Sequence, residues 1–292
     1  MRRPIEALGK FALPSTLALG VLALAAGGLS GAAFAEDTLE RLRKEGVARV
    51  GIGNEPPYSE VLGGGEVTGA APEVTRAVLN KLGVPKIEAI VVDYGAMIPG
   101  LQAGRFDIVA AGLFMKPERC QGALFSEPDV CGVEGMLVKK GNPLGIEGQG
   151  DIAANPDYKV GMCGGCVEEK YAADANVKRA QIVIVPDVPS GLKMVQDGRI
   201  DAYAMPALSL FDIVKKTGAT DVEVVAPAKN TPIACAGAAF KKSDVAFRDA
   251  YDQALAELKE SGEFEEILAE FGFTAEAAYA TTRTELCGGP NE

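Results

Sequence analysis

Apolar and polar positions alternate along the chain in two recurring patterns. Between short apolar runs, the segments 72–83 and about 166–176 carry apolar side chains every three or four residues, which predicts helices. A charged segment at about 243–262 has the same spacing and predicts a solvated outer helix. Strands that alternate with helices are typical of mainly parallel sheets covered on both faces, so we expect an α/β fold. The apolar runs, which predict strands, lie at 48–52, 87–93, 159–163, 182–187, 222–227 and 233–240.

One phrase occurs in both halves of the chain, as QAGRFDIV at 102–109 and QDGRIDAY at 196–203. Each copy follows a segment with helical spacing and contains a glycine suited to the position just after a helix. Each then continues into a short apolar run. A unit of helix, glycine and strand in each half predicts two α/β lobes.

The connections between the two halves predict where the chain crosses from lobe to lobe. We expect the first crossing within 134–143 and the return near 228–238. The first lobe would then comprise 36–135 and 236–292, and the second lobe 136–235, as a single discontinuous solute-binding module. A cleft between two such lobes is a natural binding site, because strand ends and helix N-termini point into it.

The first 35 residues have the composition of a secretory signal peptide. A basic start with Arg2, Arg3 and Lys10 precedes a long uncharged stretch that ends in Ala33-Phe34-Ala35, an A-x-A cleavage site. The uncharged stretch is long enough to span a bilayer, so a retained anchor is the alternative. Pro14 and the small residues at its end favour cleavage and a periplasmic protein.

Charge and composition exclude several functional classes. The chain has a formal net charge of −11, which disfavours phosphate backbones, so we expect no nucleic-acid partner. It contains no His, which excludes histidine-based triads, HExxH metal sites and acid–base catalysis by imidazole. We predict neither a metal nor a cofactor.

Six cysteines in an exported protein indicate disulfides rather than metal ligation. Six residues permit 15 connectivities. Proximity favours Cys120 with Cys131 and Cys163 with Cys166, which leaves Cys235 for Cys287. Cys163 and Cys166 also form a C-x-x-C at a predicted helix start, where thiol pKa is lowered, so a redox role is an alternative. The surrounding sequence lacks a thioredoxin-like WCGPC context, which favours a local disulfide.

The chain resembles the family 3 solute-binding proteins of ABC importers in the segments GIGNEPPYSE, DYGAMIPGLQAGRFDIVAAG, FSEPDVC, GRIDAYAMP and SGEFEEILAEFGF. Within that family it is similar to ectoine and hydroxyectoine receptors in NEPPY, VVDYGAMIPGLQAGRFDIVAAGLFMKPERC and TTRTELC. The resemblance implies a type II periplasmic binding fold, with two mainly parallel sheets flanked by helices and joined by two hinge strands. It also implies a monomer that closes on a small zwitterion and delivers it to a membrane permease without transforming it.

The resemblance also implies which residues bind the solute. Amino-acid receptors of this family usually carry an Asp shortly after the second GR-x-D, and here Pro206 occupies that position. A compact ammonium would be buried there without a counter-ion, which costs several kcal/mol. We therefore expect a second lobe without an acidic anchor at the pocket, although Pro206 could also simply end a strand.

Three aromatic residues map onto the family's aromatic cage: Tyr58, Tyr94 and Phe114. The flat faces of such a cage suit the delocalised cyclic amidinium of ectoine. Glu55 would accept hydrogen bonds from the ring N–H groups, and the planar fork of Arg119 would bind the carboxylate. Without the resemblance, the rings would fit ordinary core or loop packing and the two charged residues an ordinary solvated surface.

The segment GMCGGCVEEK, 161–170, departs from the ectoine receptors. Those proteins tend to carry a glycine-rich turn with a Thr whose hydroxyl contacts the carboxylate. Here Gly165 is retained and Val167 stands in the Thr position. The change removes one hydrogen bond but leaves the helix N-terminus available.

The sequence thus predicts a periplasmic receptor for ectoine or 5-hydroxyectoine. One alternative is a receptor for another cyclic or betaine-like zwitterion or an amino acid derivative. The other is a dehydratase-type enzyme on the same scaffold, for which Glu55 would be the candidate general acid.

Overall fold

The computed structural model describes residues 37–291, which belong to one compact unit, Glu36–Glu292. The predicted signal peptide, 1–35, lies outside the described residues. Among the described residues, no helix combines the length and apolar character that a bilayer-spanning segment requires.

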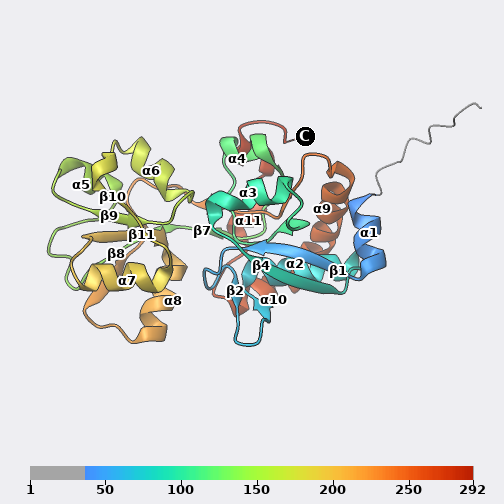
Figure 1. Cartoon of the computed structure of the whole chain (residues 1–292), viewed down its shortest axis with the longest axis horizontal. Helices are drawn as coiled ribbons and strands as arrows, with labels where there is room; N and C mark the ends of the chain where they lie inside the picture. Colours follow the sequence, from blue (N-terminus) through green and yellow to red (C-terminus); the bar gives the residue numbers. More distant parts are fainter. Residues whose placement is uncertain (1–36, 292) are drawn as a thin grey trace, which may run out of the picture. The chain divides into compact units, whose positions relative to one another are not determined.

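The first of two five-stranded sheets has the order β4-β1-β5-β14-β6 (Figure 1). Its strand β1 pairs in parallel with β4 and β5, whereas β14 is antiparallel to both of its neighbours. Four strands therefore share one direction and one opposes them. The strands of this sheet are β1 (Val47–Ile52), β4 (Lys86–Val91), β5 (Ile108–Val109), β6 (Leu124–Phe125) and β14 (Ala239–Phe240).

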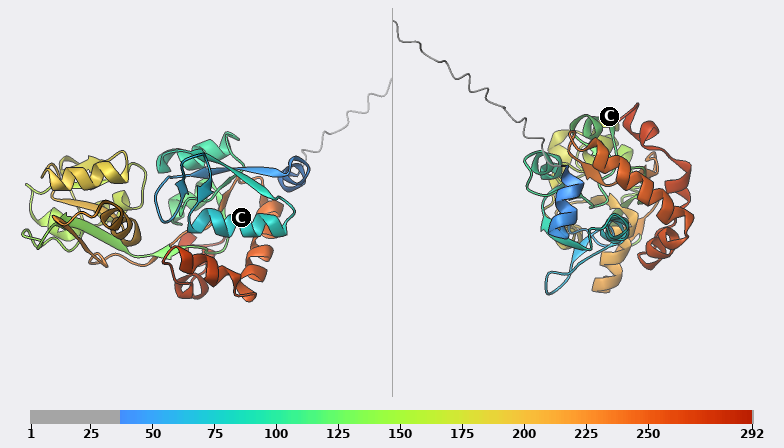
Figure 2. Two further views of the ribbon diagram at one scale, coloured as in Figure 1. Left: turned by 90° about the horizontal axis from the view of Figure 1, so that it is seen from below. Right: turned by 90° about the vertical axis from the view of Figure 1, so that its right-hand side faces the viewer.

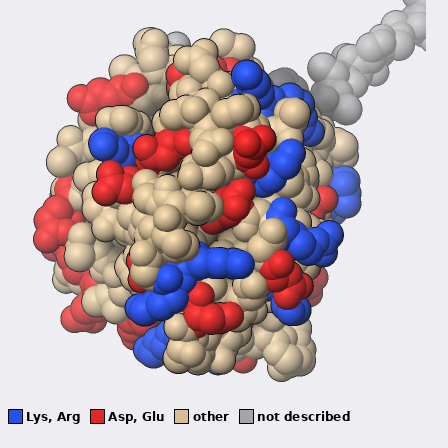
Figure 3. Space-filling view, turned by 90° about the vertical axis from the view of Figure 1, so that its left-hand side faces the viewer, with Lys and Arg blue, Asp and Glu red and all other residues tan. Residues whose placement is uncertain are grey.

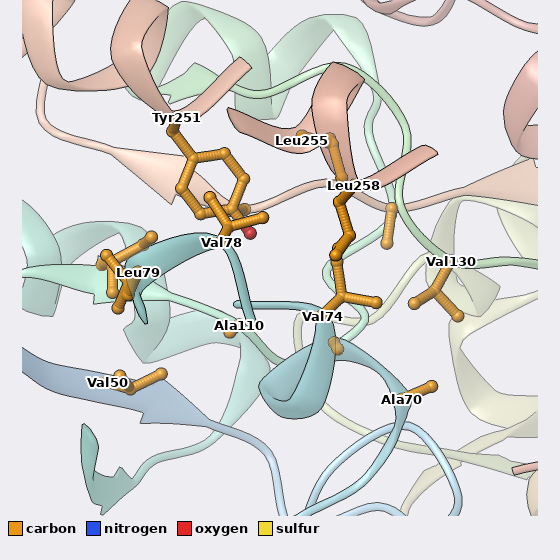
Figure 4. Close-up of a cluster of buried hydrophobic side chains, with 14 of the residues drawn as sticks. Val50, Ala70, Val74, Val78, Leu79, Ala110, Val130, Tyr251, Leu255 and Leu258 are labelled. Atoms are coloured by element: carbon orange, nitrogen blue, oxygen red, sulfur yellow. The ribbon is translucent and has the colours of Figure 1, made fainter. Parts of the chain in front are cut away.

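Helices and a small hairpin surround this sheet. Helices α2, α9 and α10 contact one another (Figure 2). The buried face of α2 presents Val74 and Val78 toward Tyr251 and Leu258 of α9, which closes the core of this lobe (Figure 4). The elements are α1 (Thr38–Glu45), β2 (Glu60–Val61), β3 (Val67–Thr68), α2 (Ala70–Lys81), α3 (Tyr94–Gln102), α4 (Pro117–Gly122), α9 (Val245–Glu260), α10 (Glu263–Glu270), α11 (Glu276–Ala280) and α12 (Arg283–Cys287).

The second sheet repeats this architecture with the order β10-β9-β11-β8-β12. Here β8 is the strand that opposes the others. On the face shown in Figure 3, acidic and basic side chains are interspersed. The elements are β8 (Glu134–Lys139), α5 (Gln149–Ala154), β9 (Val160–Met162), α6 (Glu168–Asp174), the 3₁₀ turn η1 (Arg179–Gln181), β10 (Ile182–Ile184), α7 (Val188–Gln196), β11 (Ala202–Pro206), α8 (Ala207–Thr217) and β12 (Val222–Val225).

The repeated phrase has a structural explanation. In each copy the helix ends at the Gln, the glycine has a positive φ, and a strand follows, as predicted. The aspartate ties this strand to its neighbour. Asp107 accepts a hydrogen bond from the backbone N–H of Arg49 at 2.9 Å, and Asp201 accepts one from that of Lys159 at 2.7 Å. An equivalent bond, between residues far apart in the sequence, therefore fixes the start of the central strand in both lobes.

Two short strands lie between the sheets. Strand β7 (Cys131–Gly132) pairs antiparallel with β13 (Ala234–Cys235). The chain enters the second sheet through β8 directly after β7, and it re-enters the first sheet through β14 after β13. The strands that follow the two crossings, β8 and β14, are thus the ones that run antiparallel to the other strands of their sheets.

The disulfides differ from two of the three predicted pairings. Cys163 pairs with Cys166 as expected, but Cys120 pairs with Cys287 and Cys131 with Cys235. Proximity in sequence misled the prediction because α4 and β6 carry the chain away between Cys120 and Cys131. Cys131 and Cys235 are instead direct partners in the β7–β13 register, and α12 packs against α4.

Candidate ligand-binding site

Residues from both lobes enclose a small cavity. Its volume is about 20 Å³, which is room for roughly one water molecule. A wider cavity of about 770 Å³ adjoins it and shares two of its residues, Glu55 and Tyr94. A solute larger than water would therefore need the lobes to part or side chains to move. Six of the eight predicted ligand-binding residues line the small cavity: Glu55, Tyr94, Phe114, Arg119, Val167 and Pro206. Its other lining residues are Gly112, Cys166 and Glu168.

Glu55 lies in the turn after β1 and is buried. Its backbone carbonyl accepts hydrogen bonds from the N–H groups of Tyr58 and Ser59, which fix the turn. Its carboxylate accepts a hydrogen bond of 2.8 Å from the hydroxyl of Ser209 in α8, in the other lobe. Burial raises the pKa of Glu55 to about 8, and the neighbouring charge of Glu168 adds to this shift, whereas the Ser209 bond opposes it.

Two predicted aromatic residues face the cavity. Tyr94 is the first residue of α3, and its hydroxyl donates a hydrogen bond of 2.9 Å to the carbonyl of Ala111. Its ring lies over Gly53, where any β-carbon would approach the ring within 2.8 Å. Phe114 follows β5 and forms an isolated antiparallel bridge with Ala236, next to β13. Backbone contacts in the first lobe thus fix both rings.

The third predicted aromatic residue, Tyr58, lies behind the cavity wall and does not line it. It is 1% exposed and packs edge-on between Phe114, at a centroid distance of 5.8 Å, and Phe273, at 4.8 Å. Its hydroxyl has no hydrogen-bond partner among the described residues. In this structure Tyr58 therefore supports the ring of Phe114 from behind.

Arg119 connects the two lobes. Its guanidinium donates a hydrogen bond of 2.6 Å to the carbonyl of Phe114 and one of 2.8 Å to the carbonyl of Gly165. Burial lowers its pKa, and the neighbouring Tyr94 and Glu168 oppose that shift. Both acceptors are neutral carbonyls, so a carboxylate that replaced either of them would form a stronger, charge-assisted hydrogen bond.

The helix that carries Arg119 is held by the C-terminal segment. The next residue, Cys120, forms the disulfide with Cys287. The side-chain amide of Asn291 donates hydrogen bonds to the carbonyls of Cys120 and Ala123, and its oxygen accepts one from the N–H of Phe125. These bonds cap the short helix α4, which has only six residues and little stability of its own.

The second-lobe wall is the turn closed by the Cys163–Cys166 disulfide. Gly165 in this turn has φ of +77°, and a β-carbon there would lie 2.5 Å from the Cα of Gly95 in α3. The two backbones are thus in direct contact. Val167 stands at the N-cap of α6 without a side-chain hydrogen bond, so no hydroxyl is offered at this position.

Two buried acids at the site escaped the sequence analysis. Glu168, the first residue of α6, lines the cavity. Glu134, the first residue of β8, is paired in register with the lining residue Pro206. The expectation of a second lobe without an acidic group at the pocket is therefore wrong. The sequence did contain a signal for Glu168, because a helix was predicted to start at about residue 166, next to the CGGC turn.

Comparisons with known proteins agree on the class of protein. The family model of bacterial extracellular solute-binding proteins, family 3, matches residues 48–274. The chain is 34% identical over 261 residues to a probable amino-acid ABC transporter periplasmic-binding protein, y4tE, of Sinorhizobium fredii, with 86% of each protein covered. It is 29% identical over 258 residues to the L-cystine-binding protein TcyJ of Escherichia coli, which covers 87% of this chain and 92% of TcyJ.

Two solved structures extend the comparison. A crystal structure of EhuB in complex with hydroxyectoine is 53% identical, with a TM-score of 0.84, and covers 86% of this chain and 98% of EhuB. A crystal structure of the ancestral amino acid-binding protein AncCDT-1, a precursor of cyclohexadienyl dehydratase, is 28% identical with a TM-score of 0.71. That match covers 80% of this chain and 99% of AncCDT-1.

Proposed function

Since this chain belongs to the bacterial extracellular solute-binding proteins of family 3 and has their two-lobed type II fold, we propose that it captures ectoine or 5-hydroxyectoine by lobe closure. It serves as the solute-binding component of an ABC importer, and its role is binding, not catalysis. We further propose that it works in the periplasm as a monomer, after removal of residues 1–35, and passes its solute to a membrane permease.

The carrying observation is that two aromatic rings, a guanidinium and a carboxyl meet at one cavity. Ectoine joins a carboxylate to a cyclic amidinium in one small molecule. The faces of Tyr94 and Phe114 suit the amidinium, at about 1–2 kcal/mol for a desolvated cation–π contact. Arg119 suits the carboxylate, at about 1.5–3 kcal/mol for each charge-assisted hydrogen bond. Together these terms are compatible with micromolar binding, which requires about 8 kcal/mol.

Ligand entry would exchange contacts of Arg119. The guanidinium now donates to Phe114 and Gly165, and the cavity holds about one water. A ligand carboxylate would take the place of the Gly165 carbonyl as the lobes part and close again. The second-lobe turn would then contribute backbone N–H groups at the start of α6, because Val167 has no hydroxyl.

The relatives support the proposal to different extents. The 53% identity to EhuB, crystallised with hydroxyectoine, favours a cyclic solute. The names of y4tE and TcyJ favour an amino acid or its derivative, which is the second candidate. Another cyclic or betaine-like zwitterion would satisfy the same rings and guanidinium.

Calorimetry separates these candidates. Purified protein is titrated with ectoine, 5-hydroxyectoine, proline betaine and a panel of amino acids. We expect heat with one of the first two and weaker or no heat with the rest.

Phe114→Ala should weaken binding by about 1–2 kcal/mol, and Arg119→Ala should nearly abolish it. Phe211→Ala and Arg199→Ala, at exposed positions of the second lobe, are the controls. Wild-type affinity in both site variants would show that the site is misplaced, and binding confined to an amino acid would favour the second candidate.

A further inference from the structure

Two buried carboxyl groups, Glu55 and Glu168, line the small cavity, and a third, Glu134, interacts with both of them. Glu134 and Glu168 have no assigned role. Glu134 and Glu168 are each 2% exposed. The carboxyl groups of Glu134 and Glu168 interact with each other, and among the described residues no other group forms a hydrogen bond with either oxygen of Glu134 or with Oε2 of Glu168. Both residues lie at the site itself, since Glu168 lines the cavity and Glu134 is the register partner of Pro206.

The cation of the site, Arg119, stabilises the ionised form of Glu168 through its charge but forms no ion pair with these acids among the described residues. The guanidinium of Arg119 donates its hydrogen bonds to two backbone carbonyls, those of Phe114 and Gly165. A buried carboxylate without a counter-ion is unfavourable, so such groups bind a proton or a cation. The cluster therefore has unused capacity to accept N–H donors.

We propose that Glu134 and Glu168 form a cation subsite, which binds the N–H groups at the positively charged end of the solute and releases a proton when the solute enters. The inference rests on the proposed function, because it assigns the positive end of an ectoine-like zwitterion to these two residues. The proton balance is simple. The O–H bond of a carboxylic acid breaks, its proton goes to bulk solvent, and the resulting carboxylate accepts the ligand N–H.

The electrostatics of the cluster agree with this arrangement. Burial raises the pKa of Glu134 well above its usual value, and the neighbouring Glu168 adds to the shift. Burial also raises the pKa of Glu168, while Arg119 and Lys116 oppose that shift. A bound cation stabilises the ionised forms, so affinity should rise as pH rises through the free-state pKa values. Glu55 also raises the pKa of Glu134. The charges of Glu134 or Glu168 in turn raise the pKa values of four surrounding tyrosines: Tyr58, Tyr94, Tyr171 and Tyr203.

Calorimetry in two buffers of different ionisation enthalpy, phosphate and Tris, measures the proton release. At pH 7 we expect the full protein to release protons on binding ectoine. Glu134→Gln and Glu168→Gln should each lower the number released and weaken binding by about tenfold, because an amide cannot provide the charge. Glu169→Gln, at the next position of α6, is partly exposed and should match wild type. Melting temperatures identify any variant that fails to fold.

A second probe separates this proposal from the proposed function. Acetamidinium chloride carries the amidinium but no carboxylate, so it tests the subsite alone. Suppose that wild type binds acetamidinium weakly but does not bind ectoine, and that both Gln variants lose acetamidinium binding. This result would support the subsite and overturn the ectoine assignment. If wild type, Glu134→Gln and Glu168→Gln all bind ectoine with the same affinity and release the same number of protons, the subsite proposal is overturned. The ectoine assignment would then remain intact.

Discussion

The contact between the glycine turn and α3 gives a prediction about closure. In the structure, Gly165 of the second lobe meets Gly95 of the first, backbone against backbone. A β-carbon on Gly165 would lie 2.5 Å from Cα and 2.6 Å from N of Gly95. Carbon atoms pack favourably at about 3.5–4 Å, so the variant Gly165→Ala must hold the lobes roughly 1 Å farther apart here. We therefore expect the substitution to oppose the closed state.

Two terms contribute to the effect, and they appear in different measurements. The φ of +77° costs Ala about 1–2 kcal/mol relative to Gly, which lowers the free energy of unfolding whether the lobes are open or closed. The clash with Gly95 exists only after closure, so it lowers ligand affinity. Displacing these two backbone segments at the closed cleft should weaken binding at least tenfold, about 1.4 kcal/mol.

The assay combines calorimetry with ectoine and urea denaturation of the ligand-free protein. The neighbouring Gly164→Ala is the matched control, because Gly164 lacks a positive φ and its β-carbon would meet only the Ile184 side chain, at 3.4 Å. We expect Gly164→Ala to bind within about threefold of wild type. If Gly165→Ala binds ectoine as tightly as Gly164→Ala does, the contact does not belong to the ligand-bound state and the reasoning about closure fails.

Three further predictions concern stability. Tyr58→Phe removes a buried hydroxyl that has no hydrogen-bond partner among the described residues, so the free energy of unfolding should stay level or rise by up to about 1 kcal/mol. Ectoine affinity should be unchanged, and a large loss of affinity would place Tyr58 in the site after all. Replacing Cys120 and Cys287 by Ser should lower the free energy of unfolding, measured in urea, by about 2–4 kcal/mol. It should also weaken ectoine binding, because α4 carries Arg119, and unchanged affinity would rule out a positioning role for this disulfide. Burial raises the pKa of Asp129 to about 7, so the cost of ionising this buried carboxyl destabilises the fold as pH rises from about 4 to 7. Asp129→Asn should therefore be more stable than wild type by about 1 kcal/mol or more between pH 5 and 8. Parallel profiles of unfolding free energy against pH for the two proteins would contradict this.

Much of the fold is encoded locally and was predictable. The repeated phrase predicted the helix, glycine and strand units because a glycine at positive φ ends a helix within a few residues. The aspartate in the same phrase bonds to a strand that lies far away in the sequence, and the phrase alone did not predict that bond. The apolar run 233–240 was harder to interpret. It contains two short strands, β13 and β14, which belong to different sheets, and periodicity does not report a change of sheet.

The candidate site was only partly predictable, for a similar reason. The motif PERC and the turn NEPPY identified residues that line one cavity, because each lies at the end of a strand or the start of a helix, where chains converge. Tyr58 occurs in the same motif as Glu55, yet it turns into the core and packs on Phe273, a residue far along the chain. Sequence proximity to a site residue does not determine the direction of a side chain.

The amino-acid sequence by itself determined two α/β lobes and a chain without imidazole chemistry. Its resemblance to a known family pointed to the first-lobe residues Tyr94, Phe114 and Arg119, which line one cavity in the structure. Only the tertiary structure decided the partners of Cys120 and Cys131, and only it brought Glu134 and Glu168 close to Glu55. Periodicity and turn residues in the sequence reflect the conformational preferences of residues that are neighbours along the chain. Disulfide partners and buried charges depend instead on which distant segments the folded chain brings together, and on the water that their contact excludes.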